Sequence, residues 1–520
     1  MVQPGLRQPW LRVHTPWPLL LVSTIIVVIA LVPAGFVVVR SLAIGWDQAA
    51  ALLLRPRVAE LLGNTLRLTA TSTALAALIG MALAWCTERT NLPGRNTWAV
   101  VAVLPITVPA FVSSYCWVSL TPAVQGFWGA VFIVTLAYCP LVYLPLAAVL
   151  RGMDPALEEV ARAQGFGPLR TFVHVTLPQA RPALLGGCLL VALNVLSEFG
   201  AFSLLRFSTF TTEIYTQYQL SFDGASAALL TSVLAAMCVG LLIIEVRLRG
   251  QAAAARVGKG AARRPPLHNL GRATVPVLLA LSAFAMVALV VPLATLAYWL
   301  LTGTSGALVS RALGQAVLSS VSLGLAAAIG TTACALPVAL LAVRFSSRLS
   351  TLAERSTYVS QVLPGISIAL AFVVTAVHFA RPIYQTTALL LVAYAVMFLP
   401  LALVAVRASV AQASASLEDV ARSLGCTPMQ ALRRVTIPLI LPGLGAAAAL
   451  VFLSTVTELT ATLLLAPIGT QTLAMQVWSN TDSLAYGAAA PYAAVLVVLS
   501  AVPTFILTRQ LSSLAPLAAS

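Results

Sequence analysis

Two glutamates stand inside long apolar stretches of this 520-residue chain, at matching places in its two halves. Glu198 follows Ser197, and Glu458, 260 residues later, follows Thr457. A carboxylate within a membrane span is energetically expensive and commonly faces a cavity or a charged partner. One interpretation is therefore a gate or transient contact for a cationic solute on a transport path. A hydrogen-bonded structural carboxylate fits the sequence equally well.

A loop with acidic residues also occurs twice. The segment EEVARAQGFGPLRTFVHVTLPQARP at 158–182 aligns without a gap with EDVARSLGCTPMQALRRVTIPLILP at 418–442. Upstream the match is looser, with Leu104-Pro105 facing Leu363-Pro364 and Leu144-Pro145-Leu146 facing Leu399-Pro400-Leu401. A gap-free match of this length is remote from chance, so the chain is an internal duplication. We call residues 151–182 and 411–442 the first and second repeated loops.

Each repeated loop has the signals of two short helices joined by a turn. The residues that bound these helices are Asp154 and Ser414 as N-caps, Gly165 and Gly425 as left-handed C-caps, and Pro178 and Pro438 at the end of the second helix. The acidic residues favoured by the helix dipole near each N-terminus are Glu158, Glu159, Glu418 and Asp419.

The first helix of each repeated loop carries an apolar side. Helical spacing places Leu157, Val160, Ala161 and Gln164 along it in the first loop, and Leu417, Val420, Ala421 and Leu424 in the second. Such a helix can lie on a membrane, pack on its own bundle or dock in the groove of a partner. Because it occurs twice at equivalent places, docking onto two copies of one partner is favoured.

Motifs for enzyme or metal chemistry are not found in the sequence. The seven cysteines are scattered without a CxxC pair, and the four histidines form no cluster at ligand spacing. We therefore expect no stable metal site. The one lysine, Lys259, does not lie in a phosphate-binding P-loop. The chain is thus expected not to be an enzyme and to bind no cofactor, so that any ATP and Mg²⁺ would be used by a separate ATPase.

The composition excludes a soluble enzyme, because 60% of the residues are hydrophobic and only 9% are charged. Long apolar runs recur throughout, which predicts an all-α polytopic membrane protein whose surroundings are the lipid bilayer. The net charge is +15. The basic residues lie in short loops between the runs, so they are interpreted as topology signals and no nucleic-acid partner is expected.

We expect about twelve transmembrane helices, as two tandem sets of six. Those of the first half are 17–39, 62–86, 97–119, 127–150, 183–205 and 226–246. Those of the second half are 274–301, 313–343, 356–380, 386–407, 443–466 and 487–509. Each is close to the roughly 20 residues that a helix needs to cross the hydrocarbon.

The basic residues also predict the orientation. With a cytoplasmic N-terminus, only seven of the 30 Lys and Arg residues fall outside, namely Arg40, Arg55, Arg57, Arg67, Arg206, Arg311 and Arg381. Both termini and both repeated loops are therefore expected in the cytoplasm. The domains are then a first permease half at 1–246, a flexible basic Gly/Ala/Pro linker at 247–273 and a second permease half at 274–520.

Within the repeated loops the residues reach a family resemblance. Glu159-Val160-Ala161, Gly165, Val175 and Leu177-Pro178 resemble the cytoplasmic E-A-A signature of permeases in binding-protein-dependent ABC importers. The second copy has Asp419-Val420-Ala421, Gly425, Val435 and Ile437-Pro438 at the same spacing. The departures from the signature are conservative: Val for Ala, Asp for Glu, Val for Ile and Ile for Leu.

The resemblance implies the type I ABC importer permease fold in a bacterial cytoplasmic (inner) membrane. Each repeated loop would be a coupling helix seated in a cleft of an ABC ATPase subunit, with two copies of that subunit per chain. ATP-driven closure would act through Glu158–Gly165 and Glu418–Gly425. An extracytoplasmic solute-binding protein would dock on loops 41–61, 206–225 and 467–486, where Tyr215, Tyr218 and Trp478 are candidate aromatic anchors.

The substrate follows only from finer resemblance. The strings at 103–118, 196–218, 362–373 and 456–478 are similar to those of fused iron(III) permeases. Thiamine permeases share the fused layout, and phosphonate permeases are related. A proton-coupled secondary transporter can also have twelve spans, but it gives no reason for duplicated cytoplasmic loops. A membrane-embedded enzyme would need a catalytic motif, and a channel leaves both loops unexplained.

Overall fold

The computed structural model describes residues 17–43, 46–221, 224–249, 267–303, 311–345 and 347–513, and these are almost entirely helical. The long helices of the first half are α1 (Trp17–Ala43), α3 (Pro56–Arg89), α6 (Phe127–Gly152), α9 (Leu177–Ser197) and α12 (Gly224–Arg249). Its shorter helices are α2 (Trp46–Leu53), α4 (Arg95–Val103), α5 (Ala110–Leu120), α7 (Ala156–Ala163), α8 (Pro168–Thr171), α10 (Gly200–Leu204) and α11 (Phe210–Tyr215).

The second half repeats this order. Its long helices are α15 (Arg311–Arg344), α18 (Thr387–Gln412), α21 (Ile437–Val456) and α24 (Tyr486–Ser513). Its first span consists of α13 (Thr274–Ala285) and α14 (Val291–Thr302), joined by a π-helical stretch at Met286–Val290. Its shorter helices are α16 (Arg348–Thr357), α17 (Gly365–Phe379), α19 (Ala415–Ser423), α20 (Pro428–Ala431), α22 (Thr460–Leu465) and α23 (Leu473–Asp482). Helices prevail because a backbone in lipid must satisfy its own hydrogen bonds.

Two of the expected straight spans are bent. Among the described residues, ten helices are long and apolar enough to cross a membrane, or up to twelve if each bent pair is counted as one span. The bends of 86° and 104° replace the straight helices predicted at 97–119 and 356–380. Pro109 and Pro364 stand at the bends, each as the residue before the second arm. Because proline lacks an N–H and restricts the residue before it, the helix cannot continue through it.

Ion pairs show that the bent segments connect opposite ends of the molecule. Arg89 ends α3 and pairs with Glu158, which lies just beyond the end of α6. Arg344 ends α15 and pairs with Glu418, just beyond α18. The helices before and after each bent segment therefore run in the same direction, so the segment between them must cross back. This agrees with the twelve expected spans.

The looser upstream matches between the halves were out of register. The long helices α3 and α15 begin 255 residues apart, whereas α6 and α18 begin 260 residues apart. Pro109 thus corresponds to Pro364, and Pro140, rather than Pro145, corresponds to Pro400. Four of the five extra residues lie in α17, which has 15 residues where α5 has 11.

The prediction that Pro178 and Pro438 end the second loop helix was also wrong. In the first loop, α8, a five-residue π-helical stretch at Phe172–Thr176 and α9 are continuous, and Pro178 lies in the first turn of α9. The second loop has the same arrangement, with a π-helical stretch at Leu432–Thr436. The proline is tolerated because its missing N–H falls just after the widened turn.

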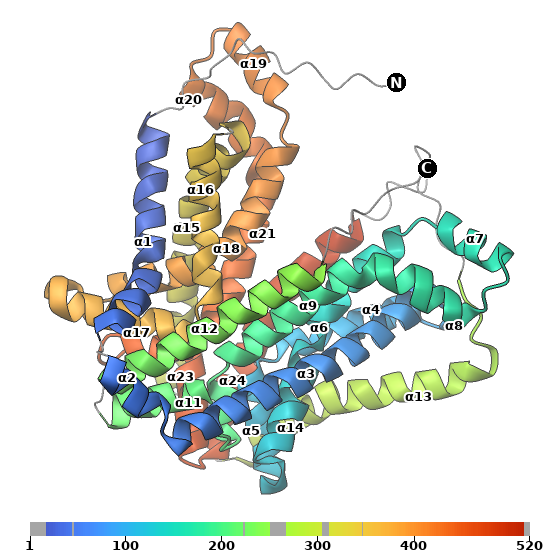
Figure 1. The fold of residues 1–520 in the computed structure, drawn as a ribbon, viewed down its shortest axis with the longest axis horizontal. Coiled ribbons are helices and arrows are strands. Elements are labelled where there is room, and N and C mark those ends of the chain that lie inside the picture. The colour runs from blue at the N-terminus through green and yellow to red at the C-terminus, as the bar shows by residue number, and fades with distance from the viewer. Residues whose placement is uncertain are drawn as a thin grey trace.

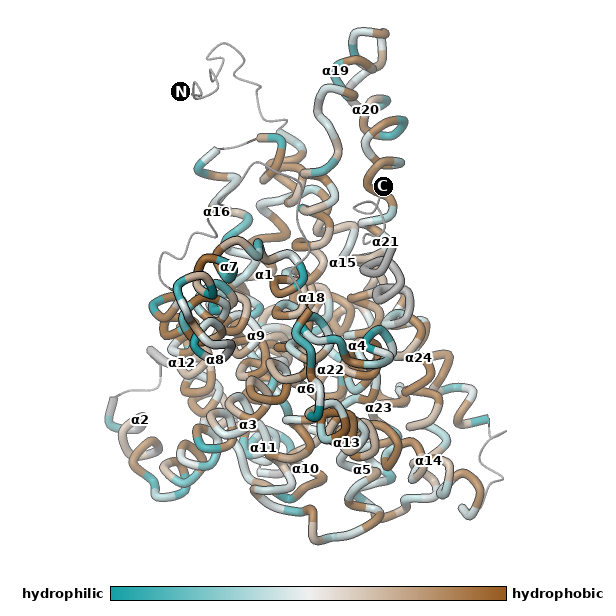
Figure 2. The backbone as a smooth tube through the Cα atoms, turned by 90° about the vertical axis from the view of Figure 1, so that its right-hand side faces the viewer, coloured by the Kyte–Doolittle hydropathy of each residue, from teal (hydrophilic) through white to brown (hydrophobic). Residues whose placement is uncertain are grey.

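The two halves exchange their first helices. Helix α1 packs against α15, α16 and α17 of the second half, whereas α13 and α14 pack against α4 and α5 of the first half. The two bundles meet at one end and diverge toward the other, where α7–α8 and α19–α20 form two separate tips (Figure 1). Hydrophilic and hydrophobic residues are mixed on these tips, and hydrophobic residues predominate along the helices between the two ends (Figure 2).

Candidate functional site

The first repeated loop is fastened to its own bundle through a buried glutamate. Glu158 in α7 is almost fully buried, and its Oε1 accepts a hydrogen bond of 2.7 Å from the Thr176 hydroxyl. Its Oε2 pairs with the fully buried Arg89 at the end of α3, and Arg162 lies 3.9 Å away. A buried charge requires such compensation, because an unpaired one is strongly destabilising. Glu158 therefore joins α7 to the ends of two spans.

The second repeated loop has the same connection in a more open form. Glu418 accepts a hydrogen bond of 2.7 Å from Thr436 and one of 2.9 Å from Arg344. The Glu418 side chain is 28% exposed, compared with 2% for Glu158. Sequence reasoning missed Arg89 and Arg344 as partners. Their 255-residue spacing, beside the 260-residue spacing of the loops, was the signal that could have identified them.

Some of the remaining predicted loop residues are exposed to solvent and others are buried. Glu159 and Asp419 are exposed, whereas Ala161 and Ala421 are buried. The left-handed turn predicted at the glycines is present, with φ of 83° at Gly165 and 88° at Gly425. The other predicted residues of this set, Pro178 and Pro438, are both exposed. Of the two predicted N-caps, Asp154 accepts a hydrogen bond of 3.0 Å from the Ala156 N–H, whereas the Ser414 side chain makes no capping bond.

Each loop presents apolar side chains that no part of the described chain covers fully. Val160 is 54% exposed and Val420 is 55% exposed, and Leu157 and Leu417 beside them are also exposed. In the first loop these residues border a shallow hollow that extends to Phe166, His174 and Pro178. Two equivalent apolar surfaces at the tips of two arms are suited to bind two copies of one partner.

The paired glutamates lie at helix breaks. Glu198 follows the end of α9, and its Oε1 accepts a 2.9 Å hydrogen bond from the Ala201 N–H in α10. Glu458 follows α21 in the same way and accepts a 2.9 Å bond from the Ala461 N–H in α22. Each carboxylate thus satisfies a backbone donor at the start of a short helix. In both halves the glutamate comes three residues before the alanine whose N–H it accepts, and this equal spacing was the signal for the role.

The surroundings of the two carboxylates differ. The Tyr138 hydroxyl donates a hydrogen bond to Glu198, whereas Phe398 occupies the corresponding place in the second half. Glu198 and Glu458 lie beside the contact between the two halves, where a side chain at Gly200 would come 2.7 Å from Leu459. Both are half-buried, as are the adjacent Ser197 and Thr457, and the Thr457 hydroxyl bonds back to Leu453 at 2.9 Å. The site therefore combines one tethered and one less restrained carboxylate.

An aromatic cluster joins the two halves next to this pair. The ring of Phe199 lies 4.7 Å from that of Tyr215 and 6.0 Å from that of Trp478. The Trp478 indole N–H also bonds to Ser203 at 3.3 Å. Tyr215 and Trp478, predicted as anchors for a docking protein, are half-buried and pack against each other across the halves.

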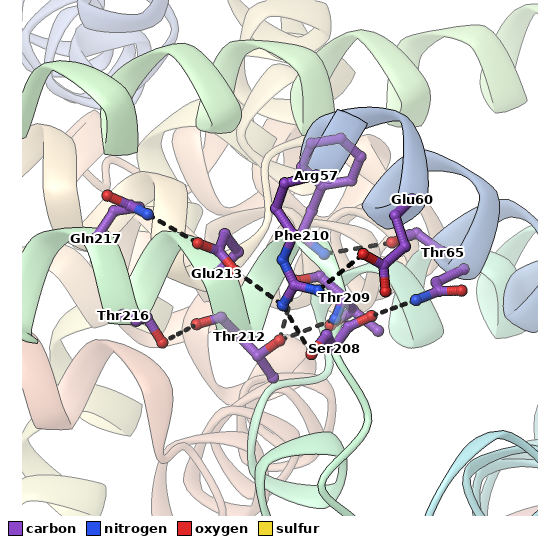
Figure 3. Close-up of polar contacts among 11 residues, drawn as sticks. Arg57, Glu60, Thr65, Ser208, Thr209, Phe210, Thr212, Glu213, Thr216 and Gln217 are labelled. Carbon is purple, nitrogen blue, oxygen red and sulfur yellow. Dashed lines mark hydrogen bonds and ion pairs between the residues drawn. The ribbon is translucent and has the colours of Figure 1, made fainter. Parts of the chain in front are cut away.

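The end opposite the repeated loops carries a polar cluster on the first half. Arg57 contacts Glu60 at 3.0 Å, Ser208 at 3.1 Å and Glu213 at 3.5 Å (Figure 3). Ile468, which corresponds to Ser208 in the second half, is 88% exposed. The two halves therefore offer different chemistry at this end. In the part of the chain that the structure describes, no three His, Cys, Asp or Glu side chains are grouped as metal ligands.

Comparison with known proteins identifies the family. Residues 61–250 and 334–514 both match the model for the binding-protein-dependent transport system inner membrane component. The chain belongs to this family. As a permease of this kind it is a multi-pass inner membrane transport subunit and not an enzyme. Its two matches agree with the two tandem halves of the fold.

Two of its relatives match along most of this permease. It is 40% identical over 481 residues to the Fe(3+)-transport system permease protein FbpB 2 of Haemophilus influenzae, covering 92% of this chain and 95% of that protein. It is 22% identical over 491 residues to the ferric transport system permease protein FbpB of Actinobacillus pleuropneumoniae, covering 87% and 71%. The sulfate transport system permease protein CysT of Salmonella typhimurium is 28% identical, but over only 41% of this chain and 84% of its own length.

Proposed function

We propose that this permease imports ferric iron as the transmembrane subunit of an ATP-driven importer. The support for iron is its 40% identity, over almost the whole of both chains, with a relative named for Fe(3+) transport. The sulfate permease relative covers less than half of this chain. The orientation expected from the basic residues would place the repeated loops, and both termini, in the cytoplasm.

The observation that carries an ATPase-coupled mechanism is the duplicated apolar surface of the repeated loops. Val160 and Val420 are exposed at the tips, while Glu158 and Glu418 fasten the same helices to spans. A force applied to such a tip passes into the spans instead of bending a slack loop. We infer that two ABC ATPase subunits, which hydrolyse Mg·ATP, bind these surfaces.

The coupling residues then have distinct roles. Glu159 and Asp419 would face the ATPase, because they are exposed. Glu158 and Glu418 would instead transmit its movement, because they are held by arginines of the permease itself. Ala161, Ala421, Gly165, Gly425, Pro178 and Pro438 would shape the surface between them.

The transport path is proposed to pass the paired glutamates. Glu198 and Glu458, next to Ser197 and Thr457, lie where the two halves meet, since a side chain at Gly200 would come 2.7 Å from Leu459. Carboxylates attract a trivalent cation, and their capping role keeps them in place without one. An extracytoplasmic binding protein would deliver iron to the opposite end, where the Arg57 cluster and the exposed Ile468 distinguish the two halves.

Uptake in a deletion strain tests this proposal. Cells lacking the gene would be assayed with radiolabelled ferric iron and labelled thiamine, and complemented with wild type or with a Gly165→Pro, Gly425→Pro variant. Proline cannot adopt the positive φ of these turns. Loss of iron uptake that only the wild type restores supports both parts of the proposal. Loss of thiamine uptake alone would overturn the substrate, and full restoration by the variant would overturn ATPase coupling.

A further inference from the structure

The last residues of the expected linker are attached to the first half. Residues 267–270, which we call the strap, lie against the end of α3, and the preceding residues 250–266 lie outside the described chain. The His268 N–H donates to the Arg89 carbonyl at 2.8 Å, and the Asn91 N–H donates to the His268 carbonyl at 3.1 Å. The Leu270 N–H bonds to the Asn91 side chain at 3.0 Å. This part of the linker is therefore not the slack tether that its composition suggested.

The side chain of His268 extends the attachment to the first repeated loop. Its ring stacks on Trp85 with centroids 5.3 Å apart, and its Nε2 lies 3.3 Å from Nη2 of Arg162 in α7. Trp85 also contacts Phe172 at 4.8 Å, and the Arg89 guanidinium lies 5.6 Å from its ring. A neutral imidazole can accept a hydrogen bond from an arginine. His268 thus joins α7, α3 and the strap.

Beyond the strap the chain enters the second half. A short 3₁₀ turn at Gly271–Ala273 leads directly into α13. Helix α13 is the first of the second half, yet it packs against α4 of the first. The strap therefore links the residue that contacts α7 directly, along the chain, to α13 of the other half.

We propose that His268 is a positioning residue for the first repeated loop. It holds Arg162, and with it α7, in the orientation that the partner ATPase engages, and the strap links movement of α7 to α13. This inference rests on the proposed ATPase-coupled function. If the strap only anchored the entry to α13, removal of the imidazole would leave ATPase binding unchanged.

Among the described residues, the aromatic part of this arrangement is found at the first loop. Trp85 corresponds to Leu340 and Phe172 to Leu432 in the second half, so the aromatic contacts are not repeated. The chain before α1, which would correspond to the strap, falls in residues 1–16 outside the described chain. The described part of the second loop therefore lacks the aromatic contacts that surround His268 in the first.

Charges around His268 give the contact a pH dependence. The charged groups that face the ring are Arg162 and Glu158 from α7 and Arg89 from α3. Burial first, and then the two arginines, lower the pKa of His268 from its ordinary 6.5, while Glu158 opposes them. The docked strap favours the neutral ring. Docking is therefore intact above pH 6.5 and weakens as the pH falls below 6.5 toward the lowered pKa.

Binding of the purified ATPase subunit to the permease in nanodiscs tests the inference without using any transported solute. We expect His268→Ala to weaken this binding about ten- to a hundredfold at pH 7.5, the effect of losing one hydrogen bond to a charged group. His268→Gln retains an acceptor for Arg162 and should restore most of the affinity. His378→Ala, at the far end of α17, is the matched control and should match the wild type.

The pH profile separates positioning from folding. Wild-type binding should weaken between pH 7.5 and 5.5, and His268→Gln should lose this part of the dependence. Unchanged affinity in His268→Ala, or the same pH profile in His268→Gln as in the wild type, would overturn the inference. Failure of the wild type to bind any ABC ATPase would overturn the proposed function, and this inference with it. Failure of iron uptake alone would leave the binding result, and the inference, standing.

Discussion

Arg89 and Glu158 form an ion pair between the end of α3 and the first repeated loop, with both side chains essentially removed from solvent. Two Arg89 nitrogens, Nε and Nη1, have no hydrogen-bond partner among the described residues. The Glu158 carboxylate lies between two arginines, Arg89 and Arg162. Its equivalent, Arg344 and Glu418, keeps the same connection at a more exposed site.

Removal of one partner should affect the two loops unequally. Arg89→Ala leaves Glu158 buried without its main counter-charge, a change that typically destabilises by about 3–5 kcal/mol. Arg344→Ala should have a clearly smaller effect, because water reaches Glu418. The thermal midpoint of the purified permease and the protease sensitivity of each loop measure this difference.

The double variant Arg89→Ala, Glu158→Gln provides the control for that prediction. With the charge gone, the amide can still accept the Thr176 hydroxyl, so part of the stability should return. Equal losses for Arg89→Ala and Arg344→Ala would contradict the difference in burial on which the prediction depends.

The apolar tips should be separable from the fold. Val160→Asp and Val420→Asp place a charge on surfaces that are already more than half exposed, so the thermal midpoint should change little. Each change should weaken ATPase binding, and the double variant should abolish it, because an unpaired charge is desolvated at the interface. Co-purification with the ATPase measures this. Asn96→Asp, which adds the same charge in α4, should leave binding intact.

A glycine contact between α3 and α6 makes a separate stability prediction. A side-chain carbon at Gly80 would lie 2.8 Å from Cβ of Val142 and 3.0 Å from the Cys139 carbonyl oxygen. Small residues permit such close helix packing in membranes. Gly80→Ala should therefore destabilise by about 1–3 kcal/mol, the usual effect of overpacking. Gly330→Ala in α15, where no atom lies within 4 Å, is the matched control and should be neutral or slightly stabilising.

The duplication was predictable because identical residues recur without a gap. That match included Thr176 and Thr436, although their contacts with Glu158 and Glu418 could not be foreseen. Arg89 and Arg344 escaped notice because they lie on other helices, where the offset between the halves differs. The comparison of halves therefore identified repeated elements better than it identified their contacts.

The bends and the strap were missed for different physical reasons. The segments around Pro109 and Pro364 are apolar on both sides, so hydropathy alone predicts a continuous helix. The strap follows a linker rich in Arg, Gly and Ala, and its attachment depends on the backbone of His268 and the side chain of Asn91. Composition does not reveal such contacts. Only the three-dimensional arrangement brings Trp85 and Arg162 to the same histidine.

The two path glutamates should respond differently to loss of charge. Glutamine at either position retains an oxygen that can accept the backbone N–H of Ala201 or Ala461, so Glu198→Gln and Glu458→Gln should both fold. Both should reduce iron uptake, and Glu458→Gln more strongly, because Tyr138 already engages Glu198. Initial uptake rates of radiolabelled ferric iron, normalised to permease in the membrane, measure the effect. Tyr138→Phe, which frees Glu198, is expected to bring the two glutamine variants closer together. Normal uptake by the double glutamine variant would leave these carboxylates with their capping role alone.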